Sequence, residues 1–279
     1  MRNDKAGKIS KLSFVGLIIT MGIVYGDIGT SPLYVMRAIA SSVTTIDNDF
    51  ILGALSCIIW TLTLQTTVKY VLITLRADNK GEGGIYSLFA LVRRKMPKAY
   101  IIAIIGGSTL LADGIITPAI TVTSAIEGLQ IVQKQLPTIP IVLIIITGLF
   151  VIQQFGTKKI GSSFGPIMTL WFLTLAILGV NQIVQLPVVF KAFNPYYALQ
   201  LIVEHPSAML VLGAVFLCIT GVEALYSDLG HCGLKNIQIS WIFVKSALIL
   251  NYLGQGAYLL KNGFNGNNPF FSIMPQWFV

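Results

Sequence analysis

The sequence predicts an all-α polytopic membrane protein, and two observations carry this prediction. First, 54% of the 279 residues are hydrophobic and only 11% are charged, whereas soluble domains carry about 25% charged residues. Second, the apolar residues gather in long runs, and about 20 predominantly apolar residues cross a bilayer as a helix. The short alternating segments typical of transmembrane β-barrels are absent from the sequence. A chain with this composition requires lipid around it.

We expect about seven transmembrane helices. They lie near 13–40, 50–75, 99–127, 138–153, 164–186, 207–229 and 238–260. The fourth is short, and the first and sixth are interrupted by glycine and polar residues. The first run follows basic residues, as in a signal peptide, but it contains Asp27 and Pro32 and is too long, so we interpret it as an uncleaved span. Between the second and third spans, residues 81–95 predict a short interfacial helix that ends at a basic cluster.

The basic residues predict the orientation of the chain. Cytoplasmic segments of membrane proteins are rich in Lys and Arg. With a cytoplasmic N-terminus, most basic residues fall on cytoplasmic segments, and the outer side holds Arg37, Lys134, Lys191 and Lys261. Membrane topology therefore explains the net charge of +8, and we expect the lipid bilayer, and no nucleic acid, as a partner. The three cysteines have neither disulfide-framework nor metal-ligand spacing.

Three acidic residues lie well inside the expected spans: Asp27, Asp113 and Glu223. A charge at the centre of a bilayer costs roughly 3 kcal/mol on insertion scales, and such residues typically mark ion paths or proton relays. The alternative is a helix-packing acid paired with a basic residue, for which Lys245 is the one residue deep enough. Three acids against one lysine favour the functional interpretation.

Each acid has neighbours that weaken a helix. Asp27 lies between Gly26 and Gly29, and Ser31-Pro32 is typical of an N-cap and first helical residue, which predicts a second helix after a break. Asp113 precedes Thr117-Pro118, and the proline frees a backbone carbonyl one turn earlier. Glu223 follows Thr220 and Gly221.

Such breaks predict a cation site. Non-helical backbone at membrane depth is tolerated where it is buried in protein or lines a cavity. Freed carbonyls, carboxylates and hydroxyls are the hard oxygen ligands that suit a dehydrated alkali cation. The two main breaks fall in the first and sixth spans, five apart, so the broken helices run in opposite directions, as in an inverted repeat of five helices each.

Six segments in the same order resemble the signature segments of the KUP/HAK/KT potassium uptake family: GIVYGDIGTSPLY, ADNKGEGGIYSLFAL, DGIITPAITVTSAIEGL, FGPIMTLWF, ITGVEALYSDLGH and LNYLGQGA. The resemblance implies the LeuT-like inverted-repeat fold of the amino acid–polyamine–cation superfamily, with repeat one at about 13–186 and the first part of repeat two at about 207–260. It also implies K⁺ uptake at the plasma membrane, with K⁺/H⁺ symport in bacterial members, which often accept Rb⁺ or Cs⁺. A homodimer is compatible with it.

Carried over to this chain, the resemblance assigns K⁺ binding to Asp27, Tyr34, Thr117 and Thr220. Asp113 and Glu223 are the remaining acids of the ion site, and which of them carries the proton stays open. Gly26, Gly29 and Gly221 are the helix-break glycines. No cofactor is expected beyond K⁺ and H⁺ as transported ions.

The resemblance also sets an expectation about length. Relatives carry twelve predicted spans and a cytoplasmic portion, so spans eight to twelve and the tail are expected outside residues 1–279. The chain would then be a piece of a longer transporter, unable to transport alone, or one of two separate chains.

Other function classes fit less well. A K⁺ channel needs a filter such as TVGYG, which the sequence lacks. A membrane aspartyl protease needs YD and GxGD motifs, whereas Gly26 separates Tyr25 from Asp27 and Asp113 lies in LADG. We therefore expect no enzyme activity. An amino-acid transporter of the same fold is the main alternative, although Asp27 at the first break would repel a substrate carboxylate.

Overall fold

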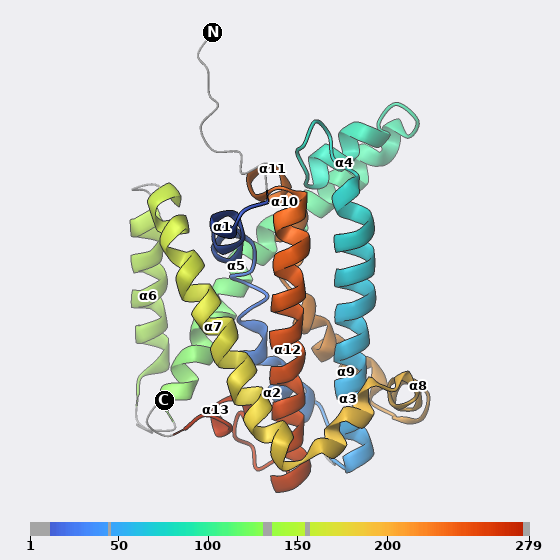
Figure 1. The fold of residues 1–279 in the computed structure, drawn as a ribbon, viewed down its shortest axis with the longest axis vertical. Helices are drawn as coiled ribbons and strands as arrows, with labels where there is room; N and C mark the ends of the chain where they lie inside the picture. The colour runs from blue at the N-terminus through green and yellow to red at the C-terminus, as the bar shows by residue number, and fades with distance from the viewer. Residues whose placement is uncertain (1–11, 44–45, 131–135, 154–156, 276–279) are drawn as a thin grey trace.

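The computed structural model describes residues 12–43, 46–130, 136–153 and 157–275. Across these ranges the chain folds into helices and short turns, with one isolated bridge between Asn79 and Glu82 (Figure 1). The all-α prediction is confirmed. The α-helices are α1 Phe14–Val24, α2 Val35–Ser41, α3 Asn48–Thr61, α4 Ile85–Val92, α5 Tyr100–Leu129, α6 Thr138–Gln153, α7 Thr157–Gln185, α8 Pro195–Glu204, α9 Ala208–Phe216, α10 Glu223–Ser227, α11 Leu229–Cys232, α12 Leu234–Asn262 and α13 Pro269–Ser272.

Shorter elements of other helical types connect them. These are η1 Ser31–Leu33, η3 Thr74–Arg76, η4 Pro97–Ala99, η5 Pro187–Phe193 and η6 Leu217–Ile219, all 3₁₀, and the π-helix η2 Leu62–Ile73. Helix starts follow ordinary capping chemistry. The side chains of Ser13, Asp47, Asn194 and Asn268 accept backbone N–H bonds at the starts of α1, α3, α8 and α13.

Five helical segments are long and apolar enough to cross a membrane: Asn48–Arg76, Pro97–Leu129, Phe164–Gln185, Ala208–Ser227 and Leu234–Asn262. Two shorter apolar helices, Phe14–Val24 and Thr138–Val151, lie in the stretches predicted as the first and fourth spans. The protein is therefore membrane-embedded and multi-pass, as the sequence predicts.

The centre of the molecule is built around α7 and α12, which pack side by side with α1 against α7 (Figure 1). Gly179 of α7 faces Gly254 of α12, and a Cβ on Gly254 would lie 2.7 Å from the Gly179 carbonyl oxygen. The two backbones can approach this closely because neither residue has a side chain. Buried side chains of α12 extend this contact into the main apolar core.

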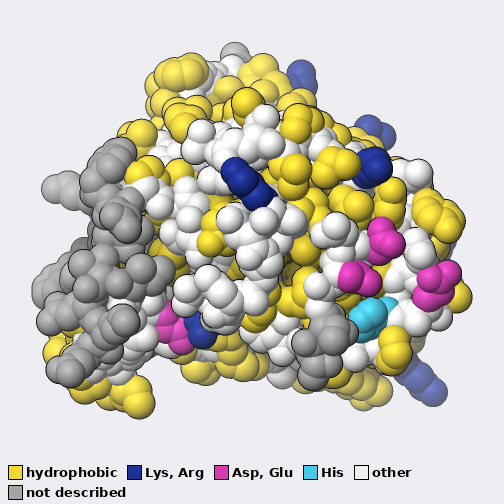
Figure 2. All heavy atoms as spheres, turned by 90° about the horizontal axis from the view of Figure 1, so that it is seen from below, with side chains coloured by type: hydrophobic (Ala, Val, Ile, Leu, Met, Phe, Trp, Pro, Cys, Tyr) yellow, Lys and Arg dark blue, Asp and Glu magenta, His cyan; other side chains and the backbone are white. Residues whose placement is uncertain are grey.

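Helix α5 lies at the edge of this core and keeps many apolar side chains exposed, among them Ile102, Leu111 and Ile115. It packs against α4, α6 and η1. The end of the molecule drawn in Figure 2 likewise shows apolar side chains over much of its surface, with charged side chains in a few groups. The exposed apolar side chains along the length of α5 suit contact with lipid.

The first expected span is interrupted between Val24 and Val35. Residues 25–30 form turns, η1 follows, and α2 begins at Val35. The prediction that Ser31 caps the second helix is wrong, because Thr30 precedes η1 and the cap lacks a side-chain hydrogen bond. The buried Ser31 hydroxyl instead lies 3.4 Å from the Tyr34 hydroxyl and 3.3 Å from that of Thr220.

The sixth expected span is interrupted in a similar way. Helix α9 ends at Phe216, η6 adds one tight turn, and α10 begins at Glu223. Thr220 has an extended ψ of 139°, and Gly221 has a φ of +83°. These two residues turn the backbone out of the helix just before Glu223.

The second expected span changes helix type within its length. Helix α3 continues directly into η2, a π-helix of 12 residues. The wider turn lets the Thr67 and Thr74 hydroxyls donate to carbonyls five residues earlier, those of Leu62 and Lys69. π-helices are rare and frequently lie at functional sites. Nothing in the hydrophobic pattern distinguishes this segment from an α-helix.

Candidate functional site: three carboxylates at two helix breaks

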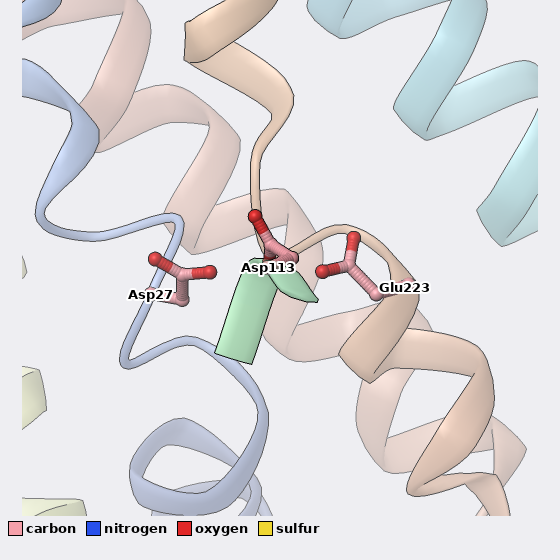
Figure 3. A group of neighbouring side chains, drawn as sticks. All are labelled: Asp27, Asp113 and Glu223. Atoms are coloured by element: carbon pink, nitrogen blue, oxygen red, sulfur yellow. The ribbon is translucent and has the colours of Figure 1, made fainter. Parts of the chain in front are cut away.

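The three acids predicted from the sequence lie together (Figure 3). One carboxylate oxygen from each of Asp27, Asp113 and Glu223 lies within 4.8 Å of the other two. They come from the first break, from α5 and from the first residue of α10, so three segments far apart in the sequence meet here. All three side chains are partly buried. Within the described ranges, no Lys or Arg forms an ion pair with any of them.

The turns of the first break hold Asp27 in place. The Thr30 backbone N–H and the Thr30 hydroxyl both donate to the Asp27 carbonyl, at 2.9 and 2.7 Å. The Asp27 carboxylate is thereby left to project toward the other acids (Figure 3). Its Oδ1 atom is buried without a hydrogen-bond partner among the described residues, and a buried polar atom of this kind requires a ligand, an ion or water.

Gly221 makes room for Asp27 at the second break. A Cβ on Gly221 would lie 2.6 Å from the Asp27 Cβ and 2.8 Å from its Oδ2. The positive φ is also strained for any residue with a side chain. Glycine is therefore required twice here, for the backbone conformation and for the approach of the carboxylate.

Gly26 and Gly29, the other two predicted break glycines, differ from each other. A Cβ on Gly26 would meet nothing within 4 Å, and its φ lies outside the left-handed region. A Cβ on Gly29 would lie 2.8 Å from the Phe172 ring. The Gly29 carbonyl accepts a 2.8 Å hydrogen bond from the Trp171 indole. Gly29 thus lets α7 pack closely against the break, whereas the structure gives Gly26 no such role.

Hydroxyl groups join the two breaks. The Tyr34 hydroxyl lies 3.2 Å from that of Thr220, and Ser31 contacts both. The Thr220 hydroxyl also lies 2.9 Å from the Leu217 carbonyl, to which it donates. Tyr34 and Thr220, predicted as ion ligands, therefore lie beside each other where the first and sixth spans meet.

Thr117, the fourth predicted ligand, lies on α5 one turn after Asp113. Its hydroxyl donates to Asp113 Oδ1 at 2.9 Å. Helix α5 continues through Pro118, which has no N–H to offer to the carbonyl one turn earlier. The predicted loosening in the third span is thus a missing hydrogen bond within a continuous helix.

Sequence reasoning missed two hydroxyls at this site. Thr30 and Thr121 lie 3.2 Å apart, hydroxyl to hydroxyl, and connect the first break to α5. The signal for Thr121 was present, because it follows Thr117 by four residues and so shares its helix face. Thr30 lies within the quoted GDIGTSPLY segment but gives no pattern of its own.

A second group of acids lies on the surface. Asp47, Asp49, Glu204 and His205 line a shallow pocket where α3 begins and α8 ends, and Figure 2 shows acidic side chains gathered around a histidine on this end of the molecule. Asp47 caps α3 and Glu204 accepts from Gln200. These acids are exposed, as loop acids are expected to be, and separate from the three-carboxylate site.

The comparison with known families decides the identity of the chain. Residues 14–279 match the family model described as the K⁺ potassium transporter integral membrane domain. The chain belongs to this family. The resemblance drawn from the six sequence segments is therefore confirmed, and no catalytic family is indicated.

Individual members of the potassium transporter family are similar over nearly the whole chain. The "Probable potassium transport system protein Kup" of Cytophaga hutchinsonii is 61% identical over 276 residues, covering 96% of this chain and 42% of the relative. The protein of the same name in Flavobacterium psychrophilum is 59% identical, with the same coverage. That of Streptococcus agalactiae serotype V is 51% identical, covering 100% of this chain and 44% of the relative.

The chain thus spans less than half the length of these potassium transporter relatives. No solved structure matches it.

Proposed function

We propose that this chain forms the cation-binding part of a transporter that takes up K⁺ across the plasma membrane. The observation that carries the proposal is the meeting of three carboxylates from three membrane segments, within 4.8 Å of one another, at two helix breaks. Membership of the potassium transporter family supports it, as do the names of the similar Kup proteins.

The ligands around the three acids are oxygens, which suits an alkali cation. Three ionised carboxylates at this distance repel one another, and no basic side chain in the described ranges compensates them. A bound cation or a proton relieves that repulsion. We propose that Asp27 holds K⁺ with the hydroxyls of Tyr34, Thr117 and Thr220, and with carbonyls that the breaks free. Rb⁺ and Cs⁺ offer the same chemistry with larger radii.

We propose proton coupling for the same site. Three ionised carboxylates with one bound K⁺ keep two uncompensated negative charges, and a proton on Asp113 or Glu223 lowers this excess to one. Because each carboxylate lies close to the other two, binding of K⁺ favours loss of the proton and binding of the proton disfavours K⁺. K⁺/H⁺ symport by alternating access requires both ions to be bound at once, and the three carboxylates carry enough negative charge to hold K⁺ and one proton together.

The proposal includes a LeuT-like inverted-repeat fold. Its support is the direct contact between the two breaks, since Thr220 lies against Ser31 and Tyr34 and Gly221 lies against Asp27. On this fold, repeat one covers about 13–186 and repeat two begins at about 207–260. The basic residues favour a cytoplasmic N-terminus, and a homodimer is compatible with this topology.

Neutralising Asp27 tests the proposal. In cells that lack their own K⁺ uptake, the complete gene that encodes this chain should support Rb⁺ uptake. Asp27→Asn keeps the size of the side chain but removes its charge, so uptake should fall by at least about 100-fold, because a lost buried ion contact costs several kcal/mol. Rb⁺ uptake is measured at equal amounts of protein in the membrane.

Asp49→Asn is the matched control, because Asp49 is exposed and outside the site. It should retain uptake. Full uptake by Asp27→Asn would contradict the assignment of Asp27. Uptake of a labelled amino acid in place of Rb⁺ would favour the amino-acid transporter of the same fold.

A further inference from the structure

Polar side chains recur along one face of α5, from the acid cluster to the end of the helix. At 100° per residue, this face is an arc of roughly 120°. Within it lie Asp113, Thr117, Thr121, Ser124 and Glu127, with Ile120 as the one apolar side chain between them. Outside this face the stretch from Asp113 to Glu127 is largely apolar, with Thr123 as its one other hydroxyl side chain, so polar side chains are concentrated on one face.

This polar face lies against the first break. Thr121 contacts Thr30, which in turn donates to the Asp27 carbonyl. Thr117 donates to Asp113. Two separate sets of hydrogen bonds, one turn apart on α5, therefore connect this face to the acid cluster and to the first break.

An ion pair ends the polar face. Arg37 of α2 donates to the carboxylate of Glu127 in the last turn of α5. The side chains are 39% and 34% exposed, so the pair is in reach of solvent. It joins the segment that follows Asp27 to the helix that carries Asp113. Helix α2 lies at the opposite end of the molecule from α4 (Figure 1), which is the outer end if the N-terminus is cytoplasmic.

We propose that the polar face of α5 is the outer path of the cation to the three carboxylates, and that the Arg37–Glu127 pair is its gate. This rests on the proposed function. While the pair is closed, the charge of Arg37 lies across the path and opposes entry of a cation. When α2 separates from α5, the Glu127 carboxylate is released and becomes the first oxygen ligand that an incoming cation meets.

The weakness of an ion pair that is partly open to water suits this role. Such pairs contribute little to stability because water competes for both partners. A gate has to open in every transport cycle, so a weak contact is required. The hydroxyls of Thr121 and Thr117, one turn apart, then offer successive oxygens between Glu127 and Asp113.

A cysteine at position 121 reports whether the path is open. Thr121→Cys is made in the complete gene, and intact cells are treated with membrane-impermeant methanethiosulfonate reagents. A cationic and an anionic reagent are used in parallel, because the variants change local charge. Cys57, Cys218 and Cys232 of this chain are buried, and the labelling of every native cysteine is measured in the parent protein and subtracted.

Three variants of the Arg37–Glu127 pair are compared in the Thr121→Cys protein: Arg37→Gln, Glu127→Gln, and the charge swap Arg37→Glu with Glu127→Arg. Both single variants should raise the labelling rate by about five-fold with either reagent, because each breaks the pair and shifts the path toward its open state. The charge swap restores an ion pair, so the labelling rate should return to that of Thr121→Cys with the native Arg37 and Glu127. Lys261→Gln is the control, because it breaks a lysine contact to Gln185 between α12 and α7, and it should change nothing.

An unchanged labelling rate in both single variants would contradict the proposal that the Arg37–Glu127 pair is a gate. So would opposite effects of Arg37→Gln and Glu127→Gln, which would show that the charges only attract or repel the reagent. Failure of the charge swap to restore slow labelling would overturn it as well. Labelling of the Thr121→Cys protein does not depend on transport. Absence of Rb⁺ uptake by the parent protein would therefore contradict the proposed function and leave the labelling test of the gate unaffected.

Discussion

Gly221 shows how one residue shapes the site. Its positive φ ends the helix before Glu223, and its missing side chain leaves space for the Asp27 carboxylate. The sequence predicts the first role, because glycine beside a buried acid is typical of a break. It gives no sign of the second, because Asp27 is far away in the chain and its approach depends on how the two breaks pack.

Gly221→Ala should abolish Rb⁺ uptake while the protein still reaches the membrane. A left-handed φ costs a residue with a Cβ about 1–2 kcal/mol, and the new methyl group would also push Asp27 out of position. Uptake is measured in K⁺-uptake-deficient cells expressing the complete gene.

Gly213→Ala is the matched control in the same span, because a Cβ there meets nothing within 4 Å. It should retain uptake. Normal uptake by Gly221→Ala would show that Asp27 does not need the position that the structure gives it.

Other residues at the site were predictable to different degrees. The three acids were predictable from the free-energy cost of placing a carboxylate in an apolar span, because acids in such positions typically serve a function. Tyr34, Thr117 and Thr220 rested on the family resemblance, and in the structure Tyr34 lies beside Thr220 and Thr117 donates to Asp113. Thr30 was not predictable, because its contact to Thr121 depends on how the first break lies against α5.

At the scale of elements, the loop before α4 packs tightly onto α10. The Tyr226 hydroxyl donates to the Ala77 carbonyl at 2.6 Å. A Cβ on Gly83 would overlap the Tyr226 carbonyl and lie 2.8 Å from its ring. Helix α10 begins with Glu223, so this loop holds the element that carries one of the three acids.

Tyr226→Phe and Gly83→Ala should both loosen this loop. Loss of this partly buried hydrogen bond costs about 1 kcal/mol, and the added methyl group forces the loop away from α10. Hydrogen exchange of segment 78–84, measured by mass spectrometry, should accelerate by about five-fold in each variant.

Gly106→Ala serves as the comparison, since a Cβ there would lie 3.4 Å from Ile85, close to ordinary contact. It should leave the exchange of segment 78–84 unchanged. If both loop variants exchanged at the parent rate, the packing of this loop on α10 would be too weak to hold the helix.

Elements were predictable where they are long and apolar. The stretches predicted for the second, third, fifth, sixth and seventh spans coincide with the five membrane-length segments of the structure. The π-helix within the second was not predictable, because π- and α-helices bury apolar residues at similar spacing. The start of the second half of span one was misassigned, because tertiary contacts to Thr220 occupy the Ser31 side chain.

At the scale of the whole molecule, the proposed symport needs K⁺ and a proton to occupy one cluster of acids together. If a proton occupies Asp113 or Glu223 during the cycle, an inward proton gradient should drive Rb⁺ accumulation. In proteoliposomes that contain the complete gene product, acidifying the outside should raise the initial rate of uptake, and a protonophore should abolish accumulation.

Variants identify the acid that carries the proton. Of Asp113→Asn and Glu223→Gln, the one that removes the proton carrier should keep Rb⁺ exchange but lose its response to the pH gradient. A parent protein whose Rb⁺ flux ignores the gradient would be a uniporter or a pore, and symport would be wrong.

The hydrogen bond from Trp171 to the Gly29 carbonyl has an optical consequence. An indole that donates to a backbone carbonyl emits at a different energy from one that donates to water or to nothing. Trp171 lies on α7, whereas its acceptor lies two residues after Asp27 in the first break. A change in the backbone of the break therefore alters the surroundings of this one chromophore, and the native fluorescence of the protein carries a signal of that change without any added dye.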